Sequence, residues 1–113
     1  MHEYSIVQAL YDSVIAQTAA RGAVAVHSLH VRIGELSGVD AGLLDTAWRT
    51  FRVHTICDEA AMEIDVVPAR WACPQCEAGV ARGGLLRCPS CGAAARLAEG
   101  DEILLDRIVM EVP

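Results

Sequence analysis

Two closely spaced cysteine pairs limit what this chain can fold into more than any other feature. They are CPQC at residues 73–76 and CPSC at residues 88–91, so the full pattern is C-x2-C-x11-C-x2-C. Four thiolates in two close pairs match the tetrahedral site that Zn(II) prefers. Gly92 follows the second pair, where a left-handed backbone is useful, whereas the first pair has Glu77 there and fits the pattern less well. We predict a structural zinc ion bound by Cys73, Cys76, Cys88 and Cys91.

The segment around these cysteines, residues 70–98, differs in character from the rest of the chain. It contains four arginines and one glutamate, a local charge of +3, whereas the whole chain has a formal net charge of -6. The remainder therefore carries -9. Because the segment has almost no apolar periodicity, hydrophobic burial alone cannot fold it, and a metal ion is expected to do so. Iron or a disulfide is the alternative, but the scarcity of aromatic residues to shield the segment favours zinc.

Outside this segment, apolar periodicity predicts two helices and three strands. Residues 3–20 have an apolar stripe at helical spacing, and a second helix is expected to begin after Asp40, a favourable N-cap residue. Alternating apolar residues predict strands over 29–33 and 62–66, and residues 102–112 predict a third. The expected apolar helix faces are Ile6, Val7, Leu10 and Val14 in the first helix, and Leu43, Leu44, Ala47, Trp48 and Phe51 in the second.

The order of these elements predicts an α+β fold class. Two helices on one face of a small three-stranded sheet are the simplest packing, and this domain is expected to comprise residues 1–69 and 99–113. Residues 70–98 are expected to form an inserted four-cysteine, zinc-ribbon-like domain. Cys57 is expected to be a small, half-buried residue beside the second helix, and His30 a surface residue on the polar face of a strand. Strand order and direction do not follow from the sequence.

Composition argues against several classes of function. The chain has 113 residues and an acidic balance, which opposes sequence-independent binding of nucleic acid. It has no signal-peptide pattern and no apolar run long enough to span a bilayer, so we expect a cytoplasmic protein without a membrane partner. An enzyme is not expected, because there is no convincing triad, carboxylate pair or phosphate-binding glycine loop, and no lysine at all.

The N-terminal residues Met1, His2 and Glu3 are a second candidate metal site. Because the side chain at position 2 is bulky, the aminopeptidase that removes Met before small residues is expected to leave Met1 in place. A free α-amine has a pKa of about 7.7–8.0 and can deprotonate near neutral pH. The amine, the His2 backbone nitrogen and the imidazole then close adjacent chelate rings, which suit Ni(II) or Cu(II). Alternatively, His2 is an ordinary polar residue at a chain end.

In order along the chain, MHE at the N-terminus, IGELSGV at 33–39, two CPxC pairs and a closing strand resemble the HypA/HybF family. These proteins are nickel metallochaperones for the maturation of NiFe hydrogenase. The resemblance covers nearly the whole chain and implies transported Ni(II) at Met1, His2 and Glu3, with structural Zn(II) at the four cysteines. It also implies a HypB-type GTPase partner and delivery to the hydrogenase large subunit. Whether urease is also served, and whether the chain forms a homodimer, stays open.

Two other functions compete with this interpretation. A zinc-ribbon regulator would bind nucleic acid through residues 70–98, whose charge of +3 permits this weakly while the acidic remainder opposes it. A redox protein would hold iron in the four cysteines, and the visible absorbance of the purified protein would distinguish it.

Overall fold

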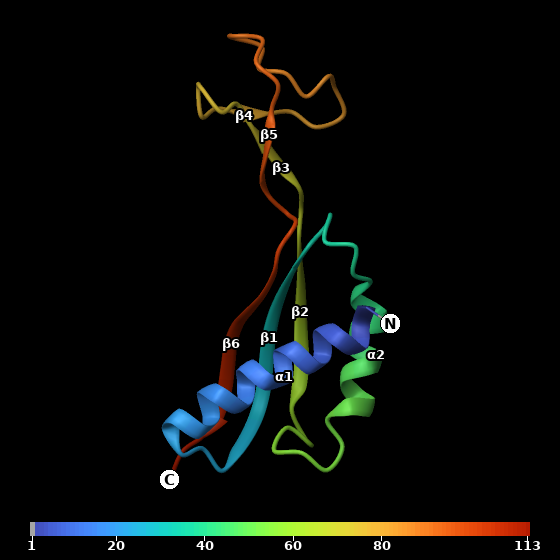
Figure 1. The fold of residues 1–113 in the computed structure, drawn as a ribbon, viewed down its shortest axis with the longest axis vertical. Helices are drawn as coiled ribbons and strands as arrows, with labels where there is room; N and C mark the ends of the chain where they lie inside the picture. The colour runs from blue at the N-terminus through green and yellow to red at the C-terminus, as the bar shows by residue number, and fades with distance from the viewer. Residues whose placement is uncertain (1) are drawn as a thin grey trace.

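Two three-stranded sheets lie at opposite ends of an elongated molecule (Figure 1). The computed structural model describes residues 2–113, apart from the side chain of His2. The principal extents are 55 × 28 × 17 Å and the radius of gyration is 17.9 Å, well above the roughly 13 Å of a compact chain of this length. The elements in chain order are α1 (His2–Arg21), β1 (Ala25–Gly34), α2 (Ala41–Phe51), β2 (Ala61–Val67), β3 (Arg70–Ala72), β4 (Gly79–Val80), β5 (Arg96–Glu99) and β6 (Ile103–Glu111).

The larger sheet has the strand order β2-β1-β6, with α1 lying across it and α2 beside β2 (Figure 1). Strands β1 and β2 are parallel. The connection between them contains α2, which returns the chain to the end of the sheet where β1 begins. Strand β6 pairs antiparallel with β1, so β1 is the central strand. Both helices and the three predicted strands are confirmed, with ends that differ from the predicted ones by a few residues.

The core lies between this sheet and the helices. Helix α1 buries Val7, Leu10 and Val14 at helical spacing, which confirms most of its predicted apolar stripe. Trp48 of α2 is fully buried, and its indole N–H donates to the Ala60 carbonyl at 2.9 Å. The core cluster contains no residue between 70 and 98. Residues 70–98, which contribute nothing to this core, are called the cysteine module below, and the rest of the chain is called the sheet domain.

Asp40 caps α2 as predicted. Its Oδ1 accepts a hydrogen bond from the Leu43 backbone N–H at 2.9 Å, which satisfies one of the free donors of the first turn. Placing Leu43 on the apolar face was wrong, because its side chain is 55% exposed. Leu44, the next residue along, is fully buried and takes the core position.

The second sheet, of order β4-β3-β5, lies within the cysteine module and was not predicted as strands. Its strands are two to four residues long, too short to show an alternating pattern in the sequence. Strand β5 ends at Glu99, one residue beyond the predicted boundary of the module. Among the residues that the structure describes, none of the helices has the length and apolar content needed to cross a membrane.

Candidate metal centre

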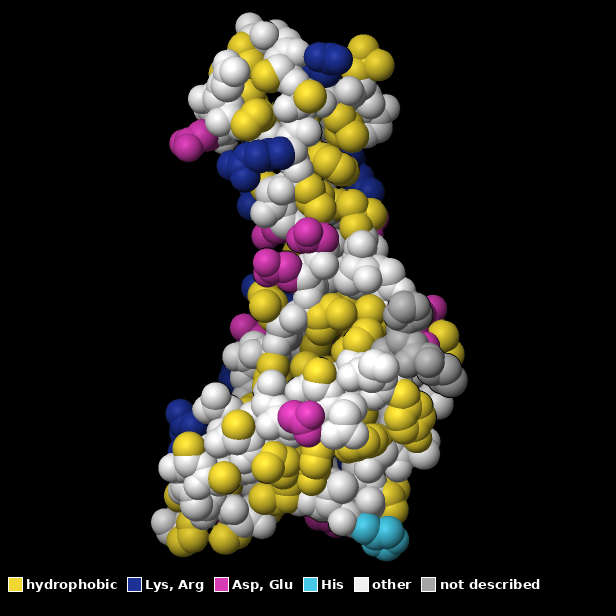
Figure 2. All heavy atoms as spheres, in the orientation of Figure 1, with side chains coloured by type: hydrophobic (Ala, Val, Ile, Leu, Met, Phe, Trp, Pro, Cys, Tyr) yellow, Lys and Arg dark blue, Asp and Glu magenta, His cyan; other side chains and the backbone are white. Residues whose placement is uncertain are grey.

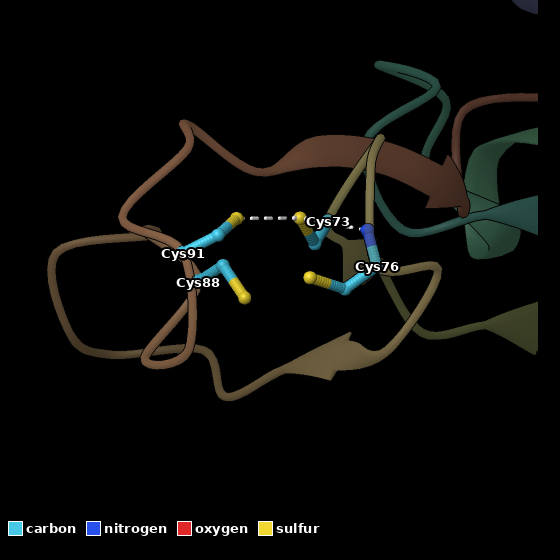
Figure 3. A group of neighbouring side chains, drawn as sticks. All are labelled: Cys73, Cys76, Cys88 and Cys91. Carbon is cyan, nitrogen blue, oxygen red and sulfur yellow. Dashed lines mark hydrogen bonds between the residues drawn. The ribbon is translucent and has the colours of Figure 1, made fainter.

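The four predicted cysteines come together at one point of the module (Figure 3). Their Sγ atoms all lie within 4.8 Å of one another, and those of Cys73 and Cys91 are 3.4 Å apart. A regular tetrahedron with Zn–S bonds of about 2.3 Å has sulfurs about 3.8 Å apart, so the donor set fits one such ion. A disulfide would need sulfurs about 2.05 Å apart, and all five cysteines of the chain are free.

The two cysteine pairs sit in turns with the same backbone hydrogen bonds. In each turn the N–H of the first cysteine donates to the carbonyl five residues later, and its carbonyl accepts from the N–H four residues later, all at 2.9 Å. Glu77 and Gly92 occupy equivalent positions, with φ angles of 58° and 76°. From the sequence, Glu77 was expected to suit this turn less well than a glycine. The backbone nevertheless adopts the left-handed conformation at both positions.

Short elements of the module flank these turns. Strand β3 leads directly into Cys73, and Arg87 and Ala94 form an isolated bridge on either side of the second pair. The Arg87 guanidinium also donates to the Gly92 carbonyl at 3.0 Å. The first cysteine of each pair is buried and the second is exposed. The site is therefore closed on its inner side and near solvent on its outer side.

Backbone donors and neighbouring sulfurs shift the pKa values of these thiols in opposite directions. N–H groups of Cys91 and Ser90 lower the pKa of Cys88 to about 6, and the N–H of Cys76 is the main cause of a lowered pKa at Cys73. The neighbouring sulfurs, that of Cys91 foremost, raise the pKa of Cys76 to about 12. Without a metal, four thiols this close cannot all lose their protons easily, because the resulting negative charges repel one another. A divalent cation at their centre stabilises every thiolate.

The predicted nickel residues cannot be placed in the same way. Met1 and the side chain of His2 lie outside the described residues. Glu3 is half-buried in the first turn of α1. Among the described residues, the four cysteines are the one group of three or more metal-binding side chains close enough to share an ion.

The remaining candidates do not form a further metal site. His30 lies between two carboxylates on the flanking strands, with ring nitrogens 2.7 Å from Asp65 Oδ2 and 3.1 Å from Asp106 Oδ2. It is therefore a partly covered residue hydrogen-bonded between two carboxylates, and its surface placement was only partly right. Cys57 is fully buried, not half-buried, and burial raises the pKa of its thiol to about 11.

Sequence reasoning missed the contact between Glu35 and Arg82. The carboxylate of Glu35 accepts two hydrogen bonds from the guanidinium, at 2.7 and 2.9 Å. No spacing rule connects Glu35 to an arginine so far along the chain.

A helix-covered sheet that carries a four-cysteine module defines a small metal-binding α+β protein. A family model described as "HypA: Hydrogenase/urease nickel incorporation, metallochaperone, hypA" matches residues 1–110. The chain therefore belongs to the HypA family, whose members are nickel metallochaperones of hydrogenase maturation. The resemblance noted in the sequence is confirmed.

Relatives and solved structures agree with this assignment. Proteins named hydrogenase maturation factor HypA share 34% identity in Shewanella baltica, with 98% of this chain and 97% of the relative covered, and 37% in Nitrosospira multiformis, with 93% of each covered. The solution structure of the Ni metallochaperone HypA from Helicobacter pylori has a TM-score of 0.74 at 25% identity, covering 98% of both chains. A second HypA solution structure has a TM-score of 0.80 at 26% identity, covering 97% of this chain and 96% of that one. The predicted fold class is confirmed.

Proposed function

We propose that this chain binds Ni(II) at its N-terminus and delivers it during the maturation of NiFe hydrogenase. The observation that carries the proposal is the extent of the family match, which begins at residue 1 and so includes MHE. The proposed nickel ligands are the Met1 amine, the backbone nitrogen and imidazole of His2, and an oxygen of Glu3. Urease is a second proposed recipient of the metal.

The position of α1 supports this ligand set. The helix begins at His2, and the first N–H groups of a helix have no partner within it, so the His2 nitrogen can release its proton to solvent and bind a metal without breaking a helical hydrogen bond. Glu3 lies in the same turn. The charge of -9 outside the cysteine module also favours the approach of a divalent cation.

The second metal in this proposal is Zn(II), held by Cys73, Cys76, Cys88 and Cys91. With four thiolates around it, the ion has no open position, so its role is to fold residues 70–98 as a separate domain. The chain then divides into a nickel-binding domain of residues 1–69 and 99–113 and this zinc-binding domain. Neither metal performs catalysis, so the protein acts as a carrier.

The proposed partners follow from the same family assignment. They are a HypB-type GTPase and the large subunit of NiFe hydrogenase, with the cytoplasm as the proposed compartment. A homodimer is compatible with this scheme. Nucleic acid is not a proposed partner, because the acidic sheet domain opposes binding to phosphate.

The nickel site can be tested with His2→Gln, which removes the imidazole and keeps a bulky residue behind Met1. We expect nickel affinity, measured by isothermal calorimetry on untagged protein, to fall by at least the roughly 10–100-fold that loss of a supporting residue costs a metal site. His27→Gln is the matched control, because this histidine is exposed and pairs with Glu111 at the far end of the sheet. Equal nickel affinity in the native and His2→Gln proteins would contradict the proposal.

Nickel binding should also depend on pH. Protons compete with the metal for the α-amine, with a pKa of about 7.7–8.0, and for imidazole, with a pKa of about 6.5. Affinity should therefore fall as the pH is lowered from 8 to 6. The measurement is the same calorimetric titration repeated across this range. A flat profile would instead indicate carboxylate ligands, which stay ionised throughout it.

A further inference from the structure

The cysteine module meets the sheet domain at a narrow waist (Figure 2). Two chain connections cross it, one from β2 to β3 through Ala69 and one from β5 to β6 through Gly100. The backbones touch directly at this crossing: a β-carbon on Gly34 would overlap the carbonyl of Gly100, and one on Gly100 would overlap Ala69. Such a crossing is made by backbone contacts, and a side-chain contact beside it adds a further constraint on the angle between the two parts.

Glu35 reaches across the waist from the sheet domain. It follows the last residue of β1, and its own N–H donates to the Val67 carbonyl at 2.8 Å, so its backbone is fixed to the edge of the sheet. Its Oε1 accepts from the Ala69 N–H at 2.8 Å and from Arg82 Nη1 at 2.7 Å, while Oε2 accepts from Arg82 Nη2 at 2.9 Å. Two parallel bonds to one guanidinium fix direction as well as distance.

Arg82 belongs to the loop between the two cysteine pairs. It lies between β4 and the second pair, in a stretch without helix or strand, and the loop is anchored at its ends by Cys76 and Cys88. The position of Arg82 therefore depends on the cysteine cluster. Its guanidinium reaches the Glu35 oxygen that also accepts from the Ala69 N–H, so this side-chain contact lies beside the backbone crossing and ties the loop of the module to it.

We propose that Glu35 and Arg82 form a latch that fixes the orientation of the cysteine module on the sheet domain. Glu35 is a positioning residue in this arrangement. The hydrogen bonds from Arg82 and Ala69 lower the pKa of its carboxyl to about 2, so the carboxyl is ionised at neutral pH. A partner that contacts both the module and the sheet domain then meets the two surfaces at a fixed angle.

The latch also connects the module to the segment that leads into α2. Residues 35–40 run from Glu35 to the N-cap Asp40, and α2 ends at Phe51. The ring of Phe51 packs against Tyr4 and Tyr11 of α1, with centroids 6.4 and 5.1 Å apart. The loop that holds Glu35 is thus continuous with the helix that supports the first turn of α1.

The test is to measure residual dipolar couplings of backbone amides in the full-length, metal-loaded protein. In the native protein, couplings from both parts should fit one alignment tensor. In Arg82→Ala and Glu35→Gln, the couplings of the module should shrink and require a separate tensor. Metal content and melting temperature should stay unchanged, because an exposed ion pair contributes little to overall stability. Arg82→Lys should give an intermediate result, since an ammonium cannot form the paired contact.

Arg96→Ala is the matched control, because Arg96 is an exposed arginine of the same module, on β5. It should keep a single tensor. A single tensor in both Arg82→Ala and Glu35→Gln would overturn the latch, and so would a separate tensor in Arg96→Ala. Dependence of the latch on the bound metal rests on the proposed zinc assignment. Metal analysis tests that assignment separately, while the arginine variants test the latch with whichever metal the cysteines hold.

Discussion

Cys73→Ser and Cys91→Ser are each expected to release about one equivalent of zinc, because either change breaks a four-thiolate site. Metal binding supplies the free energy that folds a small module of this kind, so residues 70–98 should become mobile. Trypsin should then cut after Arg82 and Arg87, which lie between the two cysteine pairs. Zinc can be measured by mass spectrometry of the metal and cleavage by mass spectrometry of the fragments.

The sheet domain should survive the same changes, since its core contains no residue of the module. Cys57→Ser is the matched control, because the same substitution is made at a cysteine that is fully buried in that core. It should keep zinc and lower the free energy of unfolding of the sheet domain by about 1–3 kcal/mol, the cost of burying a hydroxyl. Full retention of zinc by both Cys73→Ser and Cys91→Ser would show that the cysteines are not its ligands.

Local features of this chain were readable from the sequence because their physical causes are local. Asp40 caps α2 through a donor three residues away, and α1 buries Val7 and Val14 at helical spacing. The cysteine pairs were recognisable for the same reason, since each pair occupies one turn. The clustering of the two pairs was inferred from the chemistry of a shared metal, and the structure places all four sulfurs together.

Features that depend on distant residues were not readable. The sheet order β2-β1-β6 brings the end of the chain to the edge opposite β2, and no pattern within β6 specifies that edge. The contact of Glu35 with Arg82 joins residues 47 positions apart. Leu43 was placed in the core because its apolar character fits either face of the first turn of α2, and only the direction in which the helix packs decides between Leu43 and Leu44.

An N-terminal extension should abolish most of the nickel affinity while leaving the fold intact. Adding Gly-Ser-Gly before Met1 converts the α-amine into an amide, whose nitrogen does not bind a metal at neutral pH unless it loses its proton. The extension does not change the His2 imidazole, the Glu3 carboxylate or the four cysteines. We expect nickel affinity, measured by calorimetry, to fall at least as far as in His2→Gln, with zinc content and melting temperature unchanged.

The matched control is the same Gly-Ser-Gly extension after Pro113, which adds equal length at the other end and should leave nickel affinity at the native value. Comparison with His2→Gln then separates the possible ligands. If the amine and the imidazole bind the same ion, combining the N-terminal extension with His2→Gln should cost less than the sum of the two separate losses of binding free energy, because either change alone already breaks the chelate. Equal nickel affinity in the native and N-terminally extended proteins would show that the amine is not a ligand. The nickel ligands would then be other groups of the chain, and the chelate ring that joins the amine to the His2 nitrogen would not form.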